Sequence, residues 1–515
     1  MSERSERLFR AFGEIDEQNI EQAAPEEGKR FRWKRWTALA AALVLAVGVG
    51  GYVLFRMDSS SPGMNNGGGA GAGGASTFTS YAGPVFPLTL KEADRAISAE
   101  REITMKVREW SDWISQWGMQ VTDSYTLTNT SAEDRTVSVL YPFVSELQEV
   151  WNYQPVLTAD GRTLDTILHA GAYVGGFRGV DGPEDERRFN LSAPSSWEDY
   201  RGILEDGSYQ DRALGEYPDL SDISVTVYRF TGYYGPEPDS QVGIPNPTIR
   251  AGFDLDYDKT TVLSYGFHGG RFDKQAGTMI QSFSIPESDR PWYGEPYYLI
   301  VLGDDIANLT TGGYVTGGTD PDTQALLGCG VDVERYTTDL DAALREVTQL
   351  IYNSQIRNSD EFRRLDEVDY EMYHGLFCGY LLSYGLLSDH PAERYQDGWL
   401  GSLDVANVDR VFYLEAQVDI PAGGSVRLMA EMTKAPSYDF YCAHIENQVV
   451  HSYDMVTKLG SNLNCTQQTA VLEELGQYKI VRQNFGFDLD NGVKRVTLDP
   501  GQEHYYLEIK KILAE

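Results

Sequence analysis

Apolar and polar residues alternate along much of the chain after residue 80, which predicts β-strands. In the segment EREITMKV, Ile103, Met105 and Val107 alternate with polar residues, as expected for a strand with one buried face. Short runs of this kind, separated by clusters of Gly, Pro and Asp, continue from about residue 155 to 330 and return after residue 405. The pattern therefore predicts a mainly β fold.

Two turn signals add detail to this pattern. The segment VTDSYTLTNTSAEDRTVSVLYPF has two alternating runs around the polar turn NTSAED, which predicts a β-hairpin, and Asn491-Gly492 predicts a second tight turn. The runs YTLTN and VSVLYPF are similar to the opening of immunoglobulin-like sandwich domains in bacterial envelope proteins. With the strand runs that close the chain, this resemblance implies two immunoglobulin-like sandwich regions.

Helical periodicity interrupts the strands between residues 331 and 405. The segment TTDLDAALREVTQLIYNS places an apolar stripe on one face, at Leu340, Leu344, Val347 and Ile351. A second helix is predicted from the apolar positions Phe362, Leu365, Met372, Leu376 and Tyr380. Its apolar part, Tyr373 to Leu387, has only fifteen residues and contains His374, so we expect it to lie in a protein core. A further short helix is expected from Thr89 to Ile97.

The longest uncharged run, Thr37 to Phe55, has nineteen residues without an ionisable side chain. As a helix it would be about 28 Å long, which is close to the thickness of the bilayer hydrocarbon core. A secretory signal normally has a shorter apolar stretch near the N-terminus, whereas 36 residues precede this one. We expect a transmembrane helix; the alternative is a cleaved signal.

Charges beside this run set its orientation. Basic and interfacial aromatic residues precede it, at Lys29, Arg30, Arg32, Trp33, Lys34, Arg35 and Trp36, whereas Arg56 alone follows closely. We therefore expect a single-pass protein of the cell membrane, with a cytoplasmic N-terminus and an extracytoplasmic C-terminal region. Small residues recur on one face of the span and offer a surface for self-association, at Ala38, Ala42, Ala46 and Gly50.

The N-terminal tail predicts two small amphipathic helices. Their apolar positions are expected to bind a partner, and they are Leu8, Phe9, Phe12, Ile15 and Ile20. Helices this short are marginal alone in water, so they need a partner protein, the inner membrane face or each other. A flexible tail with residual helicity is the alternative.

The pattern LFRAFGEIDEQNIEQAAP, followed by the basic-aromatic cluster and one span, resembles the cytosolic head of membrane-anchored regulatory proteins of Gram-positive bacteria, described as anti-sigma factors. The resemblance covers roughly the first 55 residues. It implies that the head binds a cytosolic sigma factor while the outer region senses the envelope. Residues 1–36 contain no His or Cys, so the His-x3-Cys-x2-Cys pattern of zinc-containing heads is missing.

A Gly-rich segment after the span, DSSSPGMNNGGGAGAGGAS, predicts a flexible tether. The chain is therefore expected to have six parts: a cytosolic tail at 1–36, a transmembrane helix at 37–55, a tether at 56–80, a β-rich domain at 81–330, a helical segment at 331–405 and a C-terminal β-sandwich at 406–515.

The formal net charge of −34 falls almost entirely on the outer region, because residues 1–36 hold eight basic and eight acidic residues. Such a surface repels nucleic-acid phosphates, so we expect no nucleic-acid binding there. The outer region contains no CxxC pair, and its four cysteines are Cys329, Cys378, Cys442 and Cys465. Cys442 and Cys465 lie in one β-rich segment, and both a disulfide between them and free thiols remain open.

No motif in the sequence points to catalysis. The seven histidines form no HExxH motif and no close pair with Cys, so we expect no metal and no cofactor. The carboxylates of DLDYDKTT, from Asp254, suggest either a calcium loop or a solvated strand end. Aromatic residues beside Gly-Pro turns are candidates for stacking on sugars or peptides, namely Tyr233, Tyr234, Trp292 and Tyr293.

Two functional hypotheses follow. The first is a single-pass regulatory protein of the anti-sigma-factor kind, which binds a cytosolic partner through its N-terminal helices. The second is a surface-displayed binding or structural module of the cell envelope without a signalling role. We expect no enzyme. An enzyme in the outer region, such as a glycosidase, is the third and least favoured alternative, because the 77 acidic residues form pairs by chance throughout and the sequence selects no acid and base among them.

Overall fold

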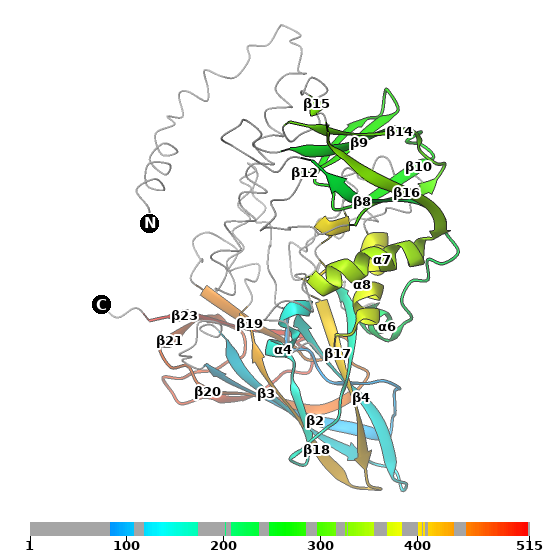
Figure 1. Ribbon diagram of the computed structural model, residues 1–515. Helices are drawn as coiled ribbons and strands as arrows, with labels where there is room; N and C mark the ends of the chain where they lie inside the picture. Colours follow the sequence, from blue (N-terminus) through cyan, green and yellow to red (C-terminus); the bar gives the residue numbers. More distant parts are fainter. Residues whose placement is uncertain are drawn as a thin grey trace, which may run out of the picture. The chain divides into compact units, whose positions relative to one another are not determined.

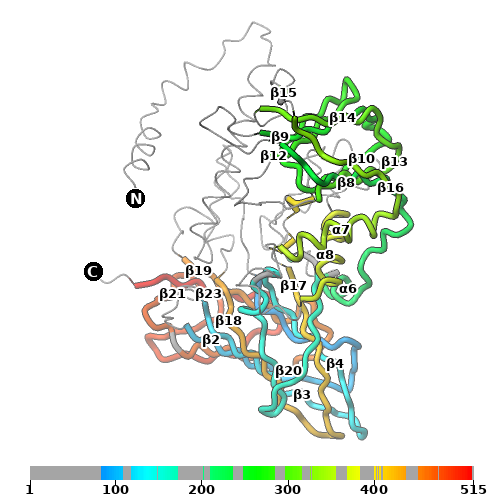
Figure 2. Tube along the Cα trace, viewed as in Figure 1, coloured from blue at the N-terminus to red at the C-terminus, as the bar shows by residue number. Residues whose placement is uncertain are grey.

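The computed structural model describes thirteen segments of the chain, which Figures 1 and 2 show in colour: residues 83–107, 118–173, 201, 208–235, 247–284, 296–315, 325–326, 328–354, 368–383, 400–403, 405–406, 410–436 and 450–512. The predicted tail, span and tether lie outside these residues. Within the segments that are described, no helix is both long and apolar enough to cross a membrane.

The described residues are mainly β-structure, as the sequence predicts, and their strands form five sheets. The largest has seven strands, in the order β22 (Arg495–Thr497), β20 (Asn464–Glu474), β2 (Ile97–Val107), β3 (Met119–Asn129), β18 (Ser425–Lys434), β5 (Val156–Ala159) and β6 (Arg162–Thr163). The side chains of β2 alternate between buried and more exposed positions along the whole strand, which confirms the pattern read from EREITMKV.

Two further sheets also contain strands from the last part of the chain. One has the order β1 (Thr89–Leu90), β4 (Arg135–Ser145), β17 (Arg410–Ile420) and β7 (Ile167–Tyr173). The other consists of β19 (Val450–Val456), β23 (His504–Lys511) and β21 (Tyr478–Gln483). Residues 81–330 and 406–515 are predicted to form separate domains, whereas strands of both segments pair within the same sheets. Figure 1 shows this mixing where β3 and β18 lie together.

The middle of the chain forms the remaining two sheets. One has the order β10 (Thr260–Tyr265), β13 (Tyr297–Gly303), β8 (Ser224–Tyr234) and β16 (Gly330–Asp339). The other has the order β11 (Gly269–Asp273), β12 (Thr278–Ser284), β9 (Thr248–Asp254), β14 (Ala307–Tyr314) and β15 (Ala325–Leu326). Both sheets contribute to one buried core, in which the rings of Phe283 and Tyr297 stack with centroids 4.0 Å apart.

The predicted hairpin around NTSAED is not formed. The strand β3 pairs with β2 and β18, whereas β4 pairs with β1 and β17, so the turn connects two different sheets. The turn between β17 and β18 connects the same two sheets, and hydrogen bonds join it to the turn between β3 and β4. The buried amide of Asn129 donates hydrogen bonds to the carbonyl oxygens of Glu133, Ile420 and Pro421, at 2.8, 3.1 and 3.2 Å.

The two principal helices of the described residues lie within the segments that the sequence predicts to be helical, although Phe362 and Leu365 of the second prediction lie outside the described residues. They are α7 (Leu340–Tyr352) and α8 (Tyr370–Ser383), and the apolar stripe of α7 is buried as expected. The predicted helix from Thr89 to Ile97 is wrong, because Thr89 begins β1 and Ile97 begins β2, with a turn around Asp94 between them. The other helices in the described part of the chain are short, and they are η2 (Leu147–Glu149), α4 (Val150–Tyr153), α6 (Ser208–Leu214) and η5 (Leu400–Ser402).

Candidate metal centre

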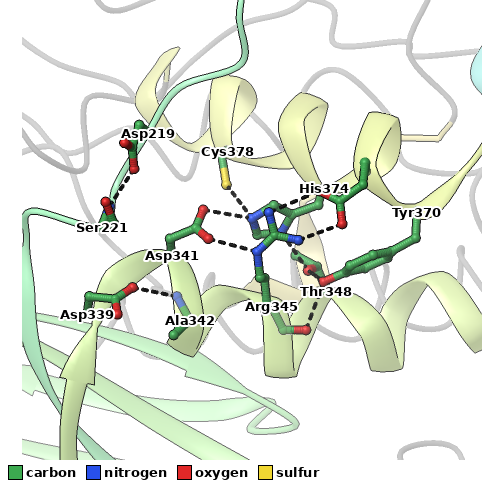
Figure 3. A network of polar contacts seen from close by, with 11 residues as sticks. Asp219, Ser221, Asp339, Asp341, Ala342, Arg345, Thr348, Tyr370, His374 and Cys378 are labelled. Carbon is green, nitrogen blue, oxygen red and sulfur yellow. Dashed lines mark hydrogen bonds and ion pairs between the residues drawn. The ribbon is translucent and has the colours of Figure 1, made fainter.

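Three side chains of α7 and α8 bring metal-binding atoms together (Figure 3). A carboxylate oxygen of Asp341, a ring nitrogen of His374 and the sulfur of Cys378 all lie within 4.8 Å of one another. His374 Nε2 is 3.0 Å from Asp341 Oδ1 and 3.6 Å from Cys378 Sγ. The imidazole is therefore in contact with both other groups through the same nitrogen.

The helical period explains why these residues meet. His374 and Cys378 are four residues apart on α8, so their side chains lie on one face of that helix. Asp341 lies in the first turn of α7, whose position is fixed by Asp339: its Oδ1 accepts a hydrogen bond from the Ala342 backbone N–H at 2.8 Å. The two helices pack against each other through their buried faces, which places Asp341 opposite the His-Cys face.

A chain of hydrogen bonds orients the imidazole. The Tyr370 hydroxyl donates to the carbonyl oxygen of Arg345 at 3.0 Å, so the Tyr370 oxygen is free to accept the Thr348 hydroxyl proton at 2.9 Å. Thr348 Oγ1 can then accept the proton of His374 Nδ1, also at 2.9 Å. In this arrangement the Nε2 lone pair of a neutral ring is directed at Asp341 and Cys378. In the other neutral tautomer the Thr348 hydroxyl donates to Nδ1, and Nε2–H donates to Asp341 Oδ1.

The surrounding charges are arranged around Asp341. Arg345 Nε donates to Asp341 Oδ2 at 2.8 Å, while its two terminal nitrogens bind the Glu371 carboxylate at 2.8 and 3.0 Å. These hydrogen bonds, to Glu371 first and to Asp341 second, raise the pKa of Arg345. One oxygen of Asp341 is thereby held by Arg345, and the other is directed at the imidazole.

Burial governs the protonation of the other two groups. His374 is 3 % exposed and Cys378 is 0 % exposed. Burial lowers the pKa of His374 and raises the pKa of the Cys378 thiol to about 12. A buried thiol with a raised pKa is a poor nucleophile. A catalytic relay would also need the imidazole to contact the thiol through one ring nitrogen and the carboxylate through the other, whereas here Nε2 contacts both Cys378 and Asp341. Aspartate, histidine and cysteine are instead a donor set suited to a borderline metal ion such as Zn²⁺.

The predicted aromatic binding residues do not form a common platform among the described residues. Tyr233 is half-buried and packs edge-on against Phe283, at a centroid distance of 6.4 Å, whereas Tyr234 is 59 % exposed. Adjacent residues of a strand point to opposite faces of the sheet, which explains the difference. Trp292 and Tyr293 lie outside the described residues, as do all the predicted partner-binding and membrane-interface positions.

Three of the four cysteines are described, and each is a free thiol: Cys329, Cys378 and Cys465. Cys442, the predicted alternative partner of Cys465, lies outside the described residues. The expectation that no histidine forms a close pair with a cysteine is wrong for His374 and Cys378, so the group around Cys378 is not among the predicted sites. The sequence does contain a pattern that predicts part of this group: residues 374–378 have the spacing His-x3-Cys within a predicted helix, and this spacing places two ligands on one helical face.

The comparisons with known proteins add no family to this description. No protein-family model matches the chain, and no curated protein matches it either.

Proposed function

We propose that the chain is a single-pass membrane protein that displays a β-rich region outside the cell and binds a cytosolic regulatory partner through its N-terminal tail. The observation that carries this proposal is the uncharged run 37–55 with its basic collar on the N-terminal side only. The strong acidity of the outer region and its mainly β structure are compatible with an extracytoplasmic position.

The finer fold assignment is part of the same proposal. We assign an immunoglobulin-like sandwich to the strands shared by the two ends of the chain. Two observations support it. The chain passes between the seven-stranded sheet and the β4-containing sheet at two turns, one between β3 and β4 and one between β17 and β18. The side-chain amide of Asn129 in the first of these segments donates hydrogen bonds to carbonyl oxygens of the second. Sandwiches of this kind commonly display ligand-binding loops at their ends.

The regulatory part of the proposal rests on the tail. Its apolar face, formed by Leu8, Phe12 and Ile15, is too short to be stable without a surface to bind. The resemblance to anti-sigma heads makes a sigma factor the partner to test first. Since a Gly-rich tether transmits torque poorly, the outer region would signal by proteolysis, clustering or mechanical pull.

The test separates topology from partner binding. Protease treatment of intact cells should remove residues 81–515 and spare the tail, whereas sparing of the outer region would overturn the topology. Replacing Leu8, Phe12 and Ile15 by Asp should abolish co-purification of a sigma factor without changing membrane insertion. Replacing the polar tail residues Glu3, Glu6 and Gln18 by Ala is the matched control and should leave co-purification unchanged.

A surface-displayed binding module is the second candidate, favoured by the size of the β-rich region relative to the tail. In this case deletion of residues 1–24 would leave function unaltered, and the outer region would retain wall material. Loss of function on that deletion would support the regulatory proposal instead.

A further inference from the structure

We infer that Asp341, His374 and Cys378 form a binding site for one Zn²⁺ ion between α7 and α8. The inference concerns the described helices alone and does not depend on what the N-terminal tail binds. The three residue types are the ones that bind zinc in proteins, and their donor atoms already converge.

The observed separations fit tetrahedral coordination. With Zn–N and Zn–O bonds of about 2.0 Å and a Zn–S bond of about 2.3 Å, neighbouring nitrogen and sulfur ligands are about 3.6 Å apart and nitrogen and oxygen ligands about 3.3 Å apart. His374 Nε2 lies 3.6 Å from Cys378 Sγ and 3.0 Å from Asp341 Oδ1. Both distances from Nε2 are therefore within a few tenths of an ångström of the tetrahedral values, and the Asp341 and Cys378 donor atoms lie within 4.8 Å of each other.

The orientation of His374 allows metal binding through Nε2. When Nδ1 of His374 donates to Thr348, the lone pair of Nε2 faces a carboxylate oxygen at a distance of 3.0 Å, and a cation between the two atoms satisfies both. In the other neutral tautomer Thr348 donates to Nδ1 and Nε2–H donates to Asp341, so the ion replaces that proton.

The residues around the three ligands match the usual outer shell of a zinc site. The ring nitrogen of His374 that does not bind the metal is held by Thr348, and the second oxygen of Asp341 is held by Arg345. Such contacts fix the orientation of the ligands before the ion binds. When Cys378 is a thiolate, the site has three negative groups, which are Cys378, Asp341 and Glu371, and one positive group, which is Arg345. The net charge of two negative units is neutralised by one divalent ion.

The fourth coordination position falls to a water molecule. The side chain of Asp341 is 22 % exposed, so solvent reaches that edge of the site, whereas His374 and Cys378 lie deeper. Because the ligands come from two helices, the bound ion links α7 to α8. Metal release should accordingly loosen this helix pair.

The first experiment uses the unmodified full-length chain in detergent, purified without a polyhistidine tag. After dialysis in excess Mg²⁺, which occupies weak carboxylate sites, elemental analysis should find one zinc per chain. Loading with Co²⁺ should give the intense visible bands of a tetrahedral ion and a thiolate-to-cobalt charge-transfer band in the near ultraviolet. Absence of bound zinc, or a cobalt spectrum without the charge-transfer band, would overturn the inference.

The second experiment uses variants. Cys378→Ser and His374→Gln should each weaken zinc binding by more than about 100-fold, and Thr348→Val, which removes only an outer contact, by about 10- to 100-fold. The matched controls are Cys465→Ser and Cys329→Ser, which change free thiols elsewhere and should bind zinc as the unmodified chain does. Chelation should lower the melting temperature of the unmodified chain and of both controls but not that of His374→Gln. Undiminished zinc binding by Cys378→Ser would contradict the assignment.

Discussion

The guanidinium of Arg101 is completely buried, and its partners explain how a charge is tolerated there. It forms two hydrogen bonds with Asp123, at 2.8 and 2.9 Å, and neither side chain of the pair is exposed. The hydroxyls of Tyr125 and Tyr141 donate to the same carboxylate at 2.9 and 3.0 Å. Arg101 also donates to the carbonyl oxygen of Val456 at 2.8 Å, so it links β2 to the strand β19.

Replacing Asp123 by Asn should therefore lower the free energy of unfolding by about 3–5 kcal/mol, because the substitution leaves the buried Arg101 charge without its partner. The midpoint of urea denaturation measures this change. The control is Glu102→Gln on the next residue of β2, which removes an exposed ion pair with Arg495. That change should cost less than about 1 kcal/mol. Equal effects of the two substitutions would show that the buried pair is not a principal determinant of stability.

His268 should make stability depend on pH. Its Nε2 accepts a hydrogen bond from the Ser284 backbone N–H at 3.0 Å, and partial desolvation by the surrounding residues lowers its pKa, although the side chain is exposed to solvent. Below about pH 6.5 this histidine is protonated in the unfolded chain. In the folded chain it becomes protonated only at a lower pH, because its pKa is lower there. Stability should fall in this window as the pH decreases, and the effect should be small because solvent screens an exposed side chain.

The variant His268→Gln tests this dependence, because the Gln amide oxygen can still accept the Ser284 hydrogen bond but does not titrate. The loss of stability between about pH 7.5 and about pH 5.5 should be smaller in the variant than in the unmodified chain. An identical pH profile would assign the acid sensitivity to other groups.

At the scale of single elements, Asp339 determines where α7 begins. Its carboxylate accepts the Ala342 N–H hydrogen bond, and the side chain stands at the end of β16, where the chain leaves the sheet. Asp339→Ala should destabilise the protein by about 1 kcal/mol, whereas Asp339→Ser, which retains an acceptor, should cost less. Thermal unfolding gives the ranking, and hydrogen exchange of the first amides of α7 shows whether the helix end frays. Faster exchange confined to α8 would argue against this role.

The success and failure of the element predictions have a common physical cause. The stripe at Leu340, Leu344, Val347 and Ile351 is a local pattern, and the helix that it predicts is the one observed. The two runs around NTSAED are equally local and correctly predict β3 and β4. Their pairing is only partly local: β3 pairs with β2 and β4 pairs with β1, but their other partners are β18 and β17, about 300 residues further along the chain. No turn signal contains that information.

The same limit applies at the scale of the whole molecule and to the candidate site. The parallel pairing of β2 with β20 joins Ser98 to Asn464, and nothing near either residue indicates the other. For the site, the spacing of His374 and Cys378 is visible in the sequence, but Asp341 joins them only because two helices pack together. Alternation thus predicts which residues are buried, whereas the contacts between distant segments decide what they are buried against.

The long-range pairing leads to a prediction about the expected C-terminal domain, residues 406–515. In the structure β17 pairs with β4 and β7, β18 pairs with β3 and β5, and β20 pairs with β2 and β22, so the isolated segment keeps only β22 as a partner of these three long strands, whereas β19, β21 and β23 keep one another. Expressed alone, it should show reduced β-sheet circular dichroism per residue and no cooperative thermal transition, because the unpaired strands leave backbone groups and apolar faces without partners.

A second variant provides the matched control. Tyr173 and Arg410 are direct partners in the pairing of β7 with β17, so a short Gly-containing turn in place of residues 174–409 joins two ends that are already adjacent. This shortened chain keeps every strand partner of β17, β18 and β20 and should unfold cooperatively with a strong β-sheet signal, although it exposes the surfaces of β7 and β17 that α6 covers. If the isolated segment 406–515 folded cooperatively, and the shortened chain did not, the pairing between the two ends of the chain would not be what stabilises this part of the protein.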